Sequence, residues 1–216
     1  MLLSIIRQNQ KLAAKRNPAF DRNRFAKFLI YFMVAFWAAY LIVIGVMLSF
    51  AFEGIFPSME PYHIMNQGLA YLLLLDFLLR FMLQPAMSQE IKPYLLMPIK
   101  KNKLVDTLLL QSGISCYNLF WFFLIVPFAL LTITRFYGFT GILCYLGGIW
   151  LLMVINNYWY LICKTLLNEK LLYMLLPIGV YGLLGAAEFI PEGNPVSTFM
   201  MNLGEGFIEG NIFAFV

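Results

Sequence analysis

Residues 88–103 read SQEIKPYLLMPIKKNK, a polar and basic segment between two long apolar runs. Pro93 and Pro98 interrupt this segment. Because proline lacks a backbone donor and restricts the residue before it, we expect a compact elbow instead of a long helix. The apolar centre of the elbow can lie on a bilayer surface or in a partner's groove while its lysines stay in water. The elbow is therefore either a docking loop or a basic loop that only fixes topology.

The composition on both sides of the elbow is that of a membrane protein. Of the 216 residues 62% are hydrophobic and 12% are charged, whereas soluble domains contain about 25% charged residues. The formal net charge is +4, but the basic residues flank apolar runs, which favours anionic lipid headgroups over nucleic acid as their partner. Cys116, Cys144 and Cys163 lie far apart inside apolar runs, so we expect neither disulfides nor a metal knuckle.

The apolar runs predict an all-α polytopic membrane helix bundle. Each run is long enough, at 1.5 Å per residue, to cross a hydrocarbon core of about 30 Å. Pro127 is the expected kink of the third run, and the proline and glycines of the fifth are expected to allow bending and close helix approach. The five predicted spans cover residues 25–52, 64–83, 104–133, 141–163 and 171–190, and the elbow covers 84–103.

The distribution of basic residues predicts the orientation. With Arg80 snorkelling toward the elbow, fourteen of the fifteen Lys and Arg residues fall on one side of the predicted membrane and Arg135 alone on the other. Because basic residues are retained on the cytoplasmic side, we expect the N-terminus in the cytoplasm and the protein in the inner membrane as a multi-pass protein.

The two ends of the chain predict surface elements. Residues 1–24 alternate apolar and basic positions and predict an interfacial amphipathic helix with an anchor on the cytoplasmic face. Residues 191–216 predict an external segment with a short surface helix that begins near Pro195. The final IFAFV is too short to cross, so it is either the first turn of a truncated sixth span or a short interfacial end.

Ionisable and amide side chains inside the spans are the intramembrane candidates for function. Asp76 and Arg80 are four residues apart, so they share a helix face and can pair. The pair either holds its span against neighbouring helices or takes part in transport or proton relay, and the structural role is the favoured interpretation. Asn156, Asn157 and Glu188 are expected to form hydrogen bonds between helices.

Catalytic motifs are absent from the sequence. His63 is the only histidine, so a metal site built from several histidines cannot form within one chain. HExxH, GxSxG and GxxxxGK[ST] do not occur, and the last absence excludes a P-loop for ATP. We therefore expect a protein that is not an enzyme.

The chain resembles the permease subunits of ABC-2-type transporters. The resemblance rests on the interfacial helix, two spans, and YLLMPIKKNKLVD at residues 94–106 leading into the third span. Together with Asn66 and DFLLRFMLQ at residues 76–84, these residues look like a bacterial family of uncharacterised ABC-2-like permeases. The similarity covers most of residues 1–128. Such permeases usually have six spans, so a five-span chain departs from the pattern and could be the N-terminal portion of one.

The resemblance implies a subunit of an ATP-driven exporter. ATP and Mg would bind to a separate ATP-binding cassette subunit, and the permease would pair with a second copy or a paralogue. The alternative is a structural or assembly subunit of an envelope complex without transport activity. The candidates for docking the ATP-binding subunit are Tyr94, Leu95, Pro98, Ile99, Lys100, Lys101 and Lys103.

Overall fold

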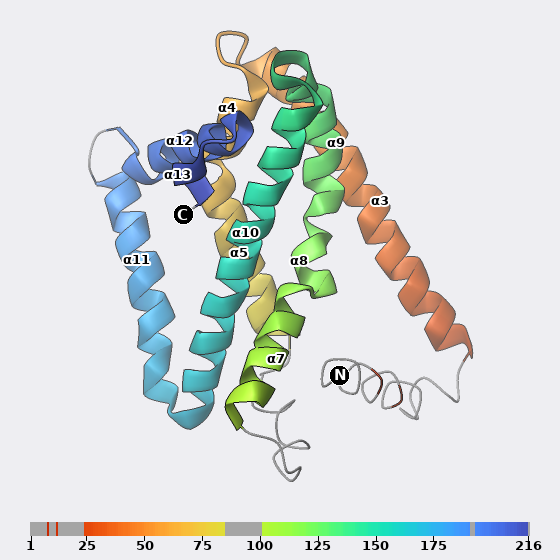
Figure 1. Ribbon diagram of the computed structural model, residues 1–216, viewed down its shortest axis with the longest axis vertical. Coiled ribbons are helices and arrows are strands. Elements are labelled where there is room, and N and C mark those ends of the chain that lie inside the picture. Colours follow the sequence, from red (N-terminus) through yellow and green to blue (C-terminus); the bar gives the residue numbers. More distant parts are fainter. Residues whose placement is uncertain (1–7, 9–11, 13–23, 85–100, 191–192, 216) are drawn as a thin grey trace.

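The computed structural model of the protein describes residues 24–84, 101–190 and 193–215, together with Gln8 and Leu12, and these residues form helices and no strands. The bundle has two ends (Figure 1). We call the end where α5 finishes and α7 begins the loop end, and the end where α4 meets α12 the cap end. The described elements are α3 (Arg24–Ile55), α4 (Pro61–Gln67), α5 (Leu69–Leu83), α7 (Lys101–Gly113), α8 (Cys116–Phe120), α9 (Phe122–Thr132), α10 (Thr134–Glu169), η2 (Leu171–Met174), α11 (Leu175–Phe189), α12 (Pro195–Glu209) and α13 (Ile212–Phe215).

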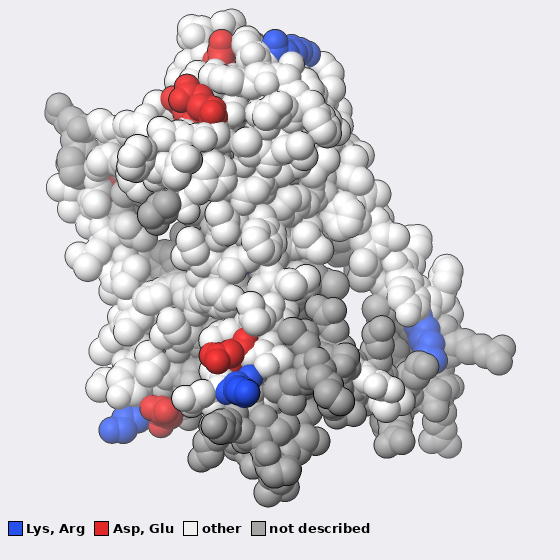
Figure 2. Space-filling model, in the orientation of Figure 1, with Lys and Arg blue, Asp and Glu red and all other residues white. Residues whose placement is uncertain are grey.

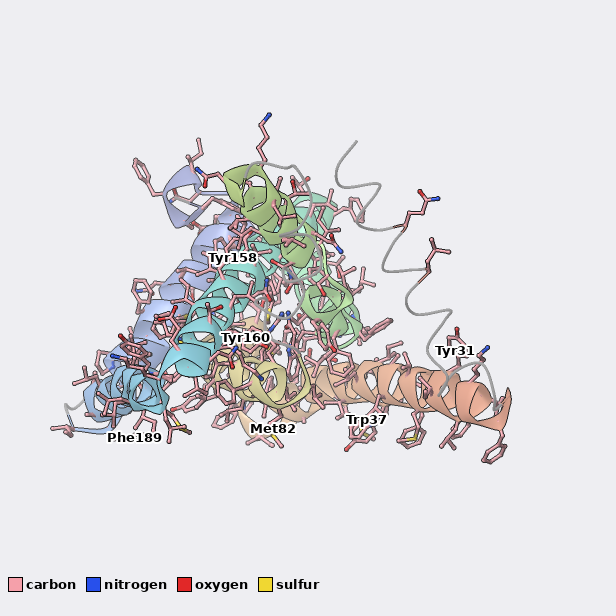
Figure 3. All side chains as sticks on the ribbon, turned by 90° about the horizontal axis from the view of Figure 1, so that it is seen from below. Tyr31, Trp37, Met82, Tyr158, Tyr160 and Phe189 are labelled. Carbon is pink, nitrogen blue, oxygen red and sulfur yellow. The ribbon has the colours of Figure 1, made fainter. Side chains whose placement is uncertain are left out.

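Helix α3 leans away from the other helices. Its 32 residues are mostly apolar and make a helix about 48 Å long, which exceeds a hydrocarbon core of about 30 Å. It packs mainly on α9, where a side chain at Gly45 would collide with the backbone of Leu124. Seen from the loop end, α3 runs out to one side, and Tyr31 and Trp37 lie away from the rest of the bundle (Figure 3). A long tilted helix of this kind suits a membrane better than water.

Helices α5, α9 and α10 surround the buried core. Ile125 and Phe128 of α9 and Tyr145 and Ile149 of α10 are completely inaccessible to solvent. Tyr145 donates a hydrogen bond of 2.9 Å to Oδ1 of Asn66 in α4, which is equally buried. These side chains hold the cap-end half of the bundle together.

Two of the predicted spans are bent pairs of helices. Helices α4 and α5 meet at 47° around Gly68, and the segment of α7 and α8 meets α9 at 64° around Trp121. Ser115 begins α8 by accepting a hydrogen bond from the Tyr117 N–H, and Asn118 donates to the Gly113 carbonyl. Pro127, where a kink was predicted, lies within helix α9, and the 64° bend lies six residues earlier, at Trp121.

The described helices fit a membrane protein. Three are long and apolar enough to cross a membrane, and the number rises to five if each bent pair counts as one span. On the face shown in Figure 2, charged side chains gather toward the two ends and a wide uncharged band separates them. The five predicted segments thus correspond to α3, α4 with α5, α7 to α9, α10, and η2 with α11.

Several predicted boundaries differ from the structure. The loop between the first two predicted segments is restricted to residues 56–60, since α3 continues to Ile55 and α4 begins at Pro61. Residues 134–140, between the third and fourth predicted spans, were expected to turn the chain around, and they belong to α10, which breaks at Gly138, where φ is 66°. Residues 164–170, between the fourth and fifth predicted spans, were expected to form a short polar link and are mostly helical, because α10 continues to Glu169. At these boundaries α3, α4 and α10 include polar residues that lie outside the apolar runs from which the spans were predicted.

The last helices close the cap end. As predicted, α12 begins at Pro195, and it packs on α4 and α10. It is more than a surface helix, because Gly204, Phe207 and Ile208 are buried. Helix α11 stands apart from α10 and is joined to it through η2 at the loop end and through α12 at the cap end (Figure 1).

Candidate functional site

Asp76 is the centre of a buried polar cluster that joins α5, α10 and the bend between α8 and α9. Its Oδ2 accepts hydrogen bonds from Nε of Arg80 at 2.6 Å and from Nδ2 of Asn156 at 2.8 Å. Its Oδ1 accepts one from Nε1 of Trp121 at 2.8 Å. Asp76 is only 3% exposed, so its charge depends on these three donors for stabilisation.

Arg80 extends the hydrogen-bonded cluster from Asp76 toward the loop end. It is 1% exposed, and its Nη1 donates to Oδ1 of Asn157 at 3.0 Å. Its Nη2 has no hydrogen-bond partner among the described residues. Leaving a buried donor unsatisfied costs about 1–3 kcal/mol, so a rearrangement that supplies an acceptor here would be favoured by that amount.

Asn157 links Arg80 to α7 and to the end of α5. Its Nδ2 donates to Oγ of Ser112 in α7 at 3.2 Å, and its Oδ1 accepts a second, longer hydrogen bond from Nε2 of Gln84 at 3.5 Å. Gln84 follows the last residue of α5. The cluster therefore runs without interruption from the middle of α5 to Gln84, the residue that follows this helix.

The end of α5 is also clamped to α10 by two side chains. The Tyr160 hydroxyl donates to the carbonyl oxygen of Gln84 at 2.6 Å. The Lys164 ammonium donates to the carbonyl oxygen of Phe81 at 2.5 Å and lies 4.8 Å from the centre of the Phe81 ring. A cation at a helix C-terminus satisfies carbonyls that have no partner within the helix. Tyr160 lies near the centre of the bundle when it is seen from the loop end (Figure 3).

Glu188 lies at the opposite end of the molecule and serves α12. Its carboxylate accepts hydrogen bonds from the backbone N–H groups of Val196, at 2.9 Å, and Ser197, at 3.1 Å, and from the Ser197 hydroxyl. These are the free donors of the first turn of α12, which a carboxylate stabilises. Glu188 is 5% exposed. The carboxylate therefore joins the end of α11 to the beginning of α12.

A second polar contact fastens the other half of α12. Nδ1 of His63 in α4 lies 2.5 Å from Oε1 of Glu205, and Nε2 of His63 lies 3.6 Å from Oε2 of Glu60. His63 stands at the cap end with Tyr62, which is buried. The contact between His63 and Glu205 therefore joins α4 to α12 at the cap end.

The structure brings together four of the five intramembrane candidates. Asp76, Arg80, Asn156 and Asn157 share one cluster, while Glu188 belongs to a separate contact at the cap end. Sequence reasoning missed Trp121 and Ser112, as well as Tyr160 and Lys164. Lys164 lies just beyond the fourth predicted span, at residues 141–163, and the aromatic residues carried no signal that distinguished them from the many others.

Most docking candidates lie outside the described residues. These are Tyr94, Leu95, Pro98, Ile99 and Lys100. Lys101 begins α7, and Lys103 is an exposed residue in the first turn of that helix. The predicted interfacial helix of residues 1–24 also lies outside, apart from Gln8 and Leu12, which are exposed, and Arg24, where α3 begins.

The cluster has the chemistry of a structural or switching element. Among the described residues no group of three or more His, Cys, Asp or Glu side chains is placed to hold a metal ion. Asp76 faces donors only, and Arg80 donates to acceptors of two residues, Asp76 and Asn157. Such a network holds charge in an apolar interior.

Comparisons with known proteins show a family without an assigned activity. A family model described as "Family of unknown function (DUF5687)" matches residues 10–216, so the chain belongs to this family. No curated protein and no solved structure matches the chain. The matched range contains every described helix from α3 to α13.

Proposed function

We propose that this member of the DUF5687 family is the membrane-spanning permease subunit of an ATP-driven exporter of the ABC-2 type. A separate ATP-binding subunit docks at residues 88–103, binds ATP and Mg, and performs hydrolysis. The permease itself is not an enzyme, and it pairs with a second copy or a paralogue. Its N-terminus is cytoplasmic, its basic residues contact anionic lipids, and it lies in the inner membrane.

The observation that carries this proposal is the connection of the buried cluster to the start of the elbow. Buried ionisable residues are costly in a membrane and occur where a protein needs them for function or for holding helices together. Here Asp76 and Arg80 are linked through Asn157 to Gln84, and Tyr160 and Lys164 hold the carbonyls at the same position. Gln84 is also the first residue of the predicted elbow at residues 84–103.

This connection supplies a mechanical path from the elbow to the bundle. When the ATP-binding subunits close, a docked elbow would pull on the end of α5. The clamp passes the displacement to α10, and the cluster exchanges hydrogen bonds at Asn157 and Arg80 Nη2. Such a network has few alternative arrangements, so it favours two discrete positions of α5 over a continuous range.

One observation favours the alternative of an assembly subunit. The loop-end half of α3 has large exposed apolar side chains, among them a row of stacked rings at Phe28, Phe32, Phe36 and Tyr40. A face of this kind could pack on another membrane protein of an envelope complex, and no transport would be needed for that.

Copurification tests the proposal. The chain is purified from its native membrane in mild detergent, beside the triple variant Lys100→Glu, Lys101→Glu, Lys103→Glu, and accompanying proteins are identified by mass spectrometry. We expect a P-loop ATPase with the parent chain and its loss from the variant. The matched control is Arg7→Glu, Lys11→Glu, Lys15→Glu, which makes the same change in charge on the same predicted side and should retain the ATPase.

Two results would contradict the proposal. If no ATPase accompanies the parent chain while other envelope proteins do, the assembly role replaces transport. If the ATPase remains with the elbow variant, the docking site lies elsewhere and the elbow only fixes topology.

A further inference from the structure

Helices α10 and α11 diverge and leave a cavity between them. They are joined at the loop end by η2, and α12 bridges them at the cap end (Figure 1). Between these ends α11 touches α5 at the rings of Phe77 and Tyr181, whose centres are 5.0 Å apart. The cavity lies on the cap-end side of this ring contact, between α5, α10 and α11, and α12 closes it at the cap end.

The cavity has the size and lining of a site for an apolar molecule. Its volume is about 540 Å³, within the range of about 300–1,000 Å³ that is typical of small-molecule sites. Leu74, Leu152, Leu184 and Met200 are among the apolar residues that line it. The polar contributions come from Tyr71, Asn156, Trp159, Tyr181, Glu188 and Ser197.

The cavity opens sideways, toward the surface that faces the membrane. Ile155 and Tyr71 line the cavity and are 63% and 50% exposed, and Phe189 on the other rim is 76% exposed. Phe189 stands at the outer edge of the bundle in Figure 3. At the depth of the hydrocarbon core, the molecules that reach such an opening are the alkyl chains of lipids and other amphiphiles.

We infer that this cavity binds the alkyl chain of an amphiphile that enters from the bilayer, with its polar head toward Glu188 and Ser197 at the cap end. That this amphiphile is the exported substrate rests on the function proposed above. Glu188 and Ser197 are the polar residues at the cap end of the cavity, and the rest of the lining is mainly apolar, which suits an amphiphile whose head lies at that end.

Asn156 connects the cavity to the buried cluster. It lines the cavity and donates from Nδ2 to Oδ2 of Asp76 and, at 3.0 Å, to the carbonyl oxygen of Leu73. A chain that fills the cavity packs against this amide and so against the pair of Asp76 and Arg80. Occupancy of the cavity can therefore be sensed at the end of α5, where the elbow begins.

A photoreactive long-chain alcohol, whose uncharged head can donate to a carboxylate, tests the binding site directly. The purified full chain in detergent is incubated with hexadecanol that carries a diazirine in its alkyl chain, then irradiated, and labelled residues are located by peptide mass spectrometry. We expect labels on the cavity residues Leu152, Trp159 and Leu184, and competition by unlabelled hexadecanol. Labels on Leu183, which is 73% exposed and outside the cavity, should not be competed.

Two glycines of α11 provide matched variants. Gly185 lines the cavity, Gly182 does not, and a side chain at either position meets no atom within 4 Å. Gly185→Phe fills the cavity, so competed labelling should fall about tenfold, while Gly182→Phe should label as the parent chain does. Competition in the parent chain is measured independently, so the test stands even if Gly185→Phe does not fold.

Three outcomes would overturn the inference. Labelling that unlabelled hexadecanol does not compete, or equal labelling of the two glycine variants, would show contact with bulk detergent or lipid only. A photoreactive amino acid at Leu152 that crosslinks to another polypeptide would show that a protein helix fills the cavity. Since no ATPase is present, the labelling result and the copurification result fail or succeed separately.

Discussion

At the scale of single residues, Asp76 shows how a charge is kept in an apolar interior. Its two oxygens accept from three side chains on three elements, and each of these donors is itself held in place. A buried ion pair is not in itself a source of stability, because removing two charges from water costs about as much as their attraction returns. Removing only one partner is different, since the other charge stays buried.

This asymmetry gives the first prediction. Asp76→Leu leaves the Arg80 charge without its partner and should destabilise the protein by about 3–5 kcal/mol. The double variant Asp76→Leu, Arg80→Met removes both charges and should recover much of that loss. The measurement is thermal unfolding of the purified protein in detergent, and the double variant should unfold at a higher temperature than the single one.

A second ion pair serves as the control. Glu53 and Arg135 pair at the surface, where their side chains are 39% and 52% exposed, so Glu53→Ala should cost less than about 1 kcal/mol. If Asp76→Leu were as mild as Glu53→Ala, or if the double variant were the least stable of the three, Asp76 would not be the charge that stabilises Arg80.

Lys164 gives a second prediction at this scale. Lys164→Met keeps much of the apolar side chain but removes the donor to the carbonyl oxygens of Phe81 and Gln84. A charge-assisted hydrogen bond contributes about 1.5–3 kcal/mol, so the unfolding temperature should fall. Lys170→Met is the control, because Lys170 is exposed just after α10. Equal unfolding temperatures for the two variants would show that the hydrogen bonds of Lys164 do not contribute to the stability of the folded protein.

At the scale of elements, some glycines allow two helices to pack closely. The sequence alone does not show which glycines these are. The glycines of α11 were expected to allow close approach, but positions 179, 182 and 185 have open space around them. The close approaches occur at Gly45 against α9, Gly148 against Phe207, and Gly204 against Asn66. This contact pattern depends on which helices are neighbours, which local sequence does not contain.

The seat of α12 on α10 gives the third prediction. A side chain at Gly148 would occupy the place of the Phe207 ring, which is buried against it. Gly148→Ala should therefore destabilise the packing of α12 by about 1–3 kcal/mol, in spite of the better helix propensity of alanine. Thermal unfolding, together with the rate of proteolysis between α11 and α12, would measure the effect.

Two further variants isolate the cause. In a Phe207→Ala background the added methyl group meets no ring, so Gly148→Ala should no longer be destabilising. Gly182→Ala should stabilise by up to about 1 kcal/mol, because its surroundings are open. A loss of stability at Gly148 that persists without Phe207 would mean that another neighbour is responsible.

At the scale of the whole molecule, periodicity and charge predicted the segments but not their arrangement. Long apolar runs flanked by basic residues were enough to place five helical segments and the helix at Pro195. The pairing of Asp76 with Arg80 followed from their spacing. Trp121, the separation of α11 from α10, and the cavity between them depend on long-range packing, so a single sequence could not reveal them.

The orientation of the bundle in the membrane gives the last prediction. The native cysteines are replaced by alanine, and single cysteines are introduced at Lys103 and at Ser58, which lies in the exposed loop between α3 and α4. With a cytoplasmic N-terminus, a maleimide that cannot cross the membrane should label position 58 in intact cells and position 103 only after the cells are opened. The reason is the excess of Lys and Arg at the loop end, which translocation does not favour. Labelling of position 103 in intact cells would place the elbow outside, where no ATP-binding subunit could reach it, and would exclude the exporter proposal together with the orientation.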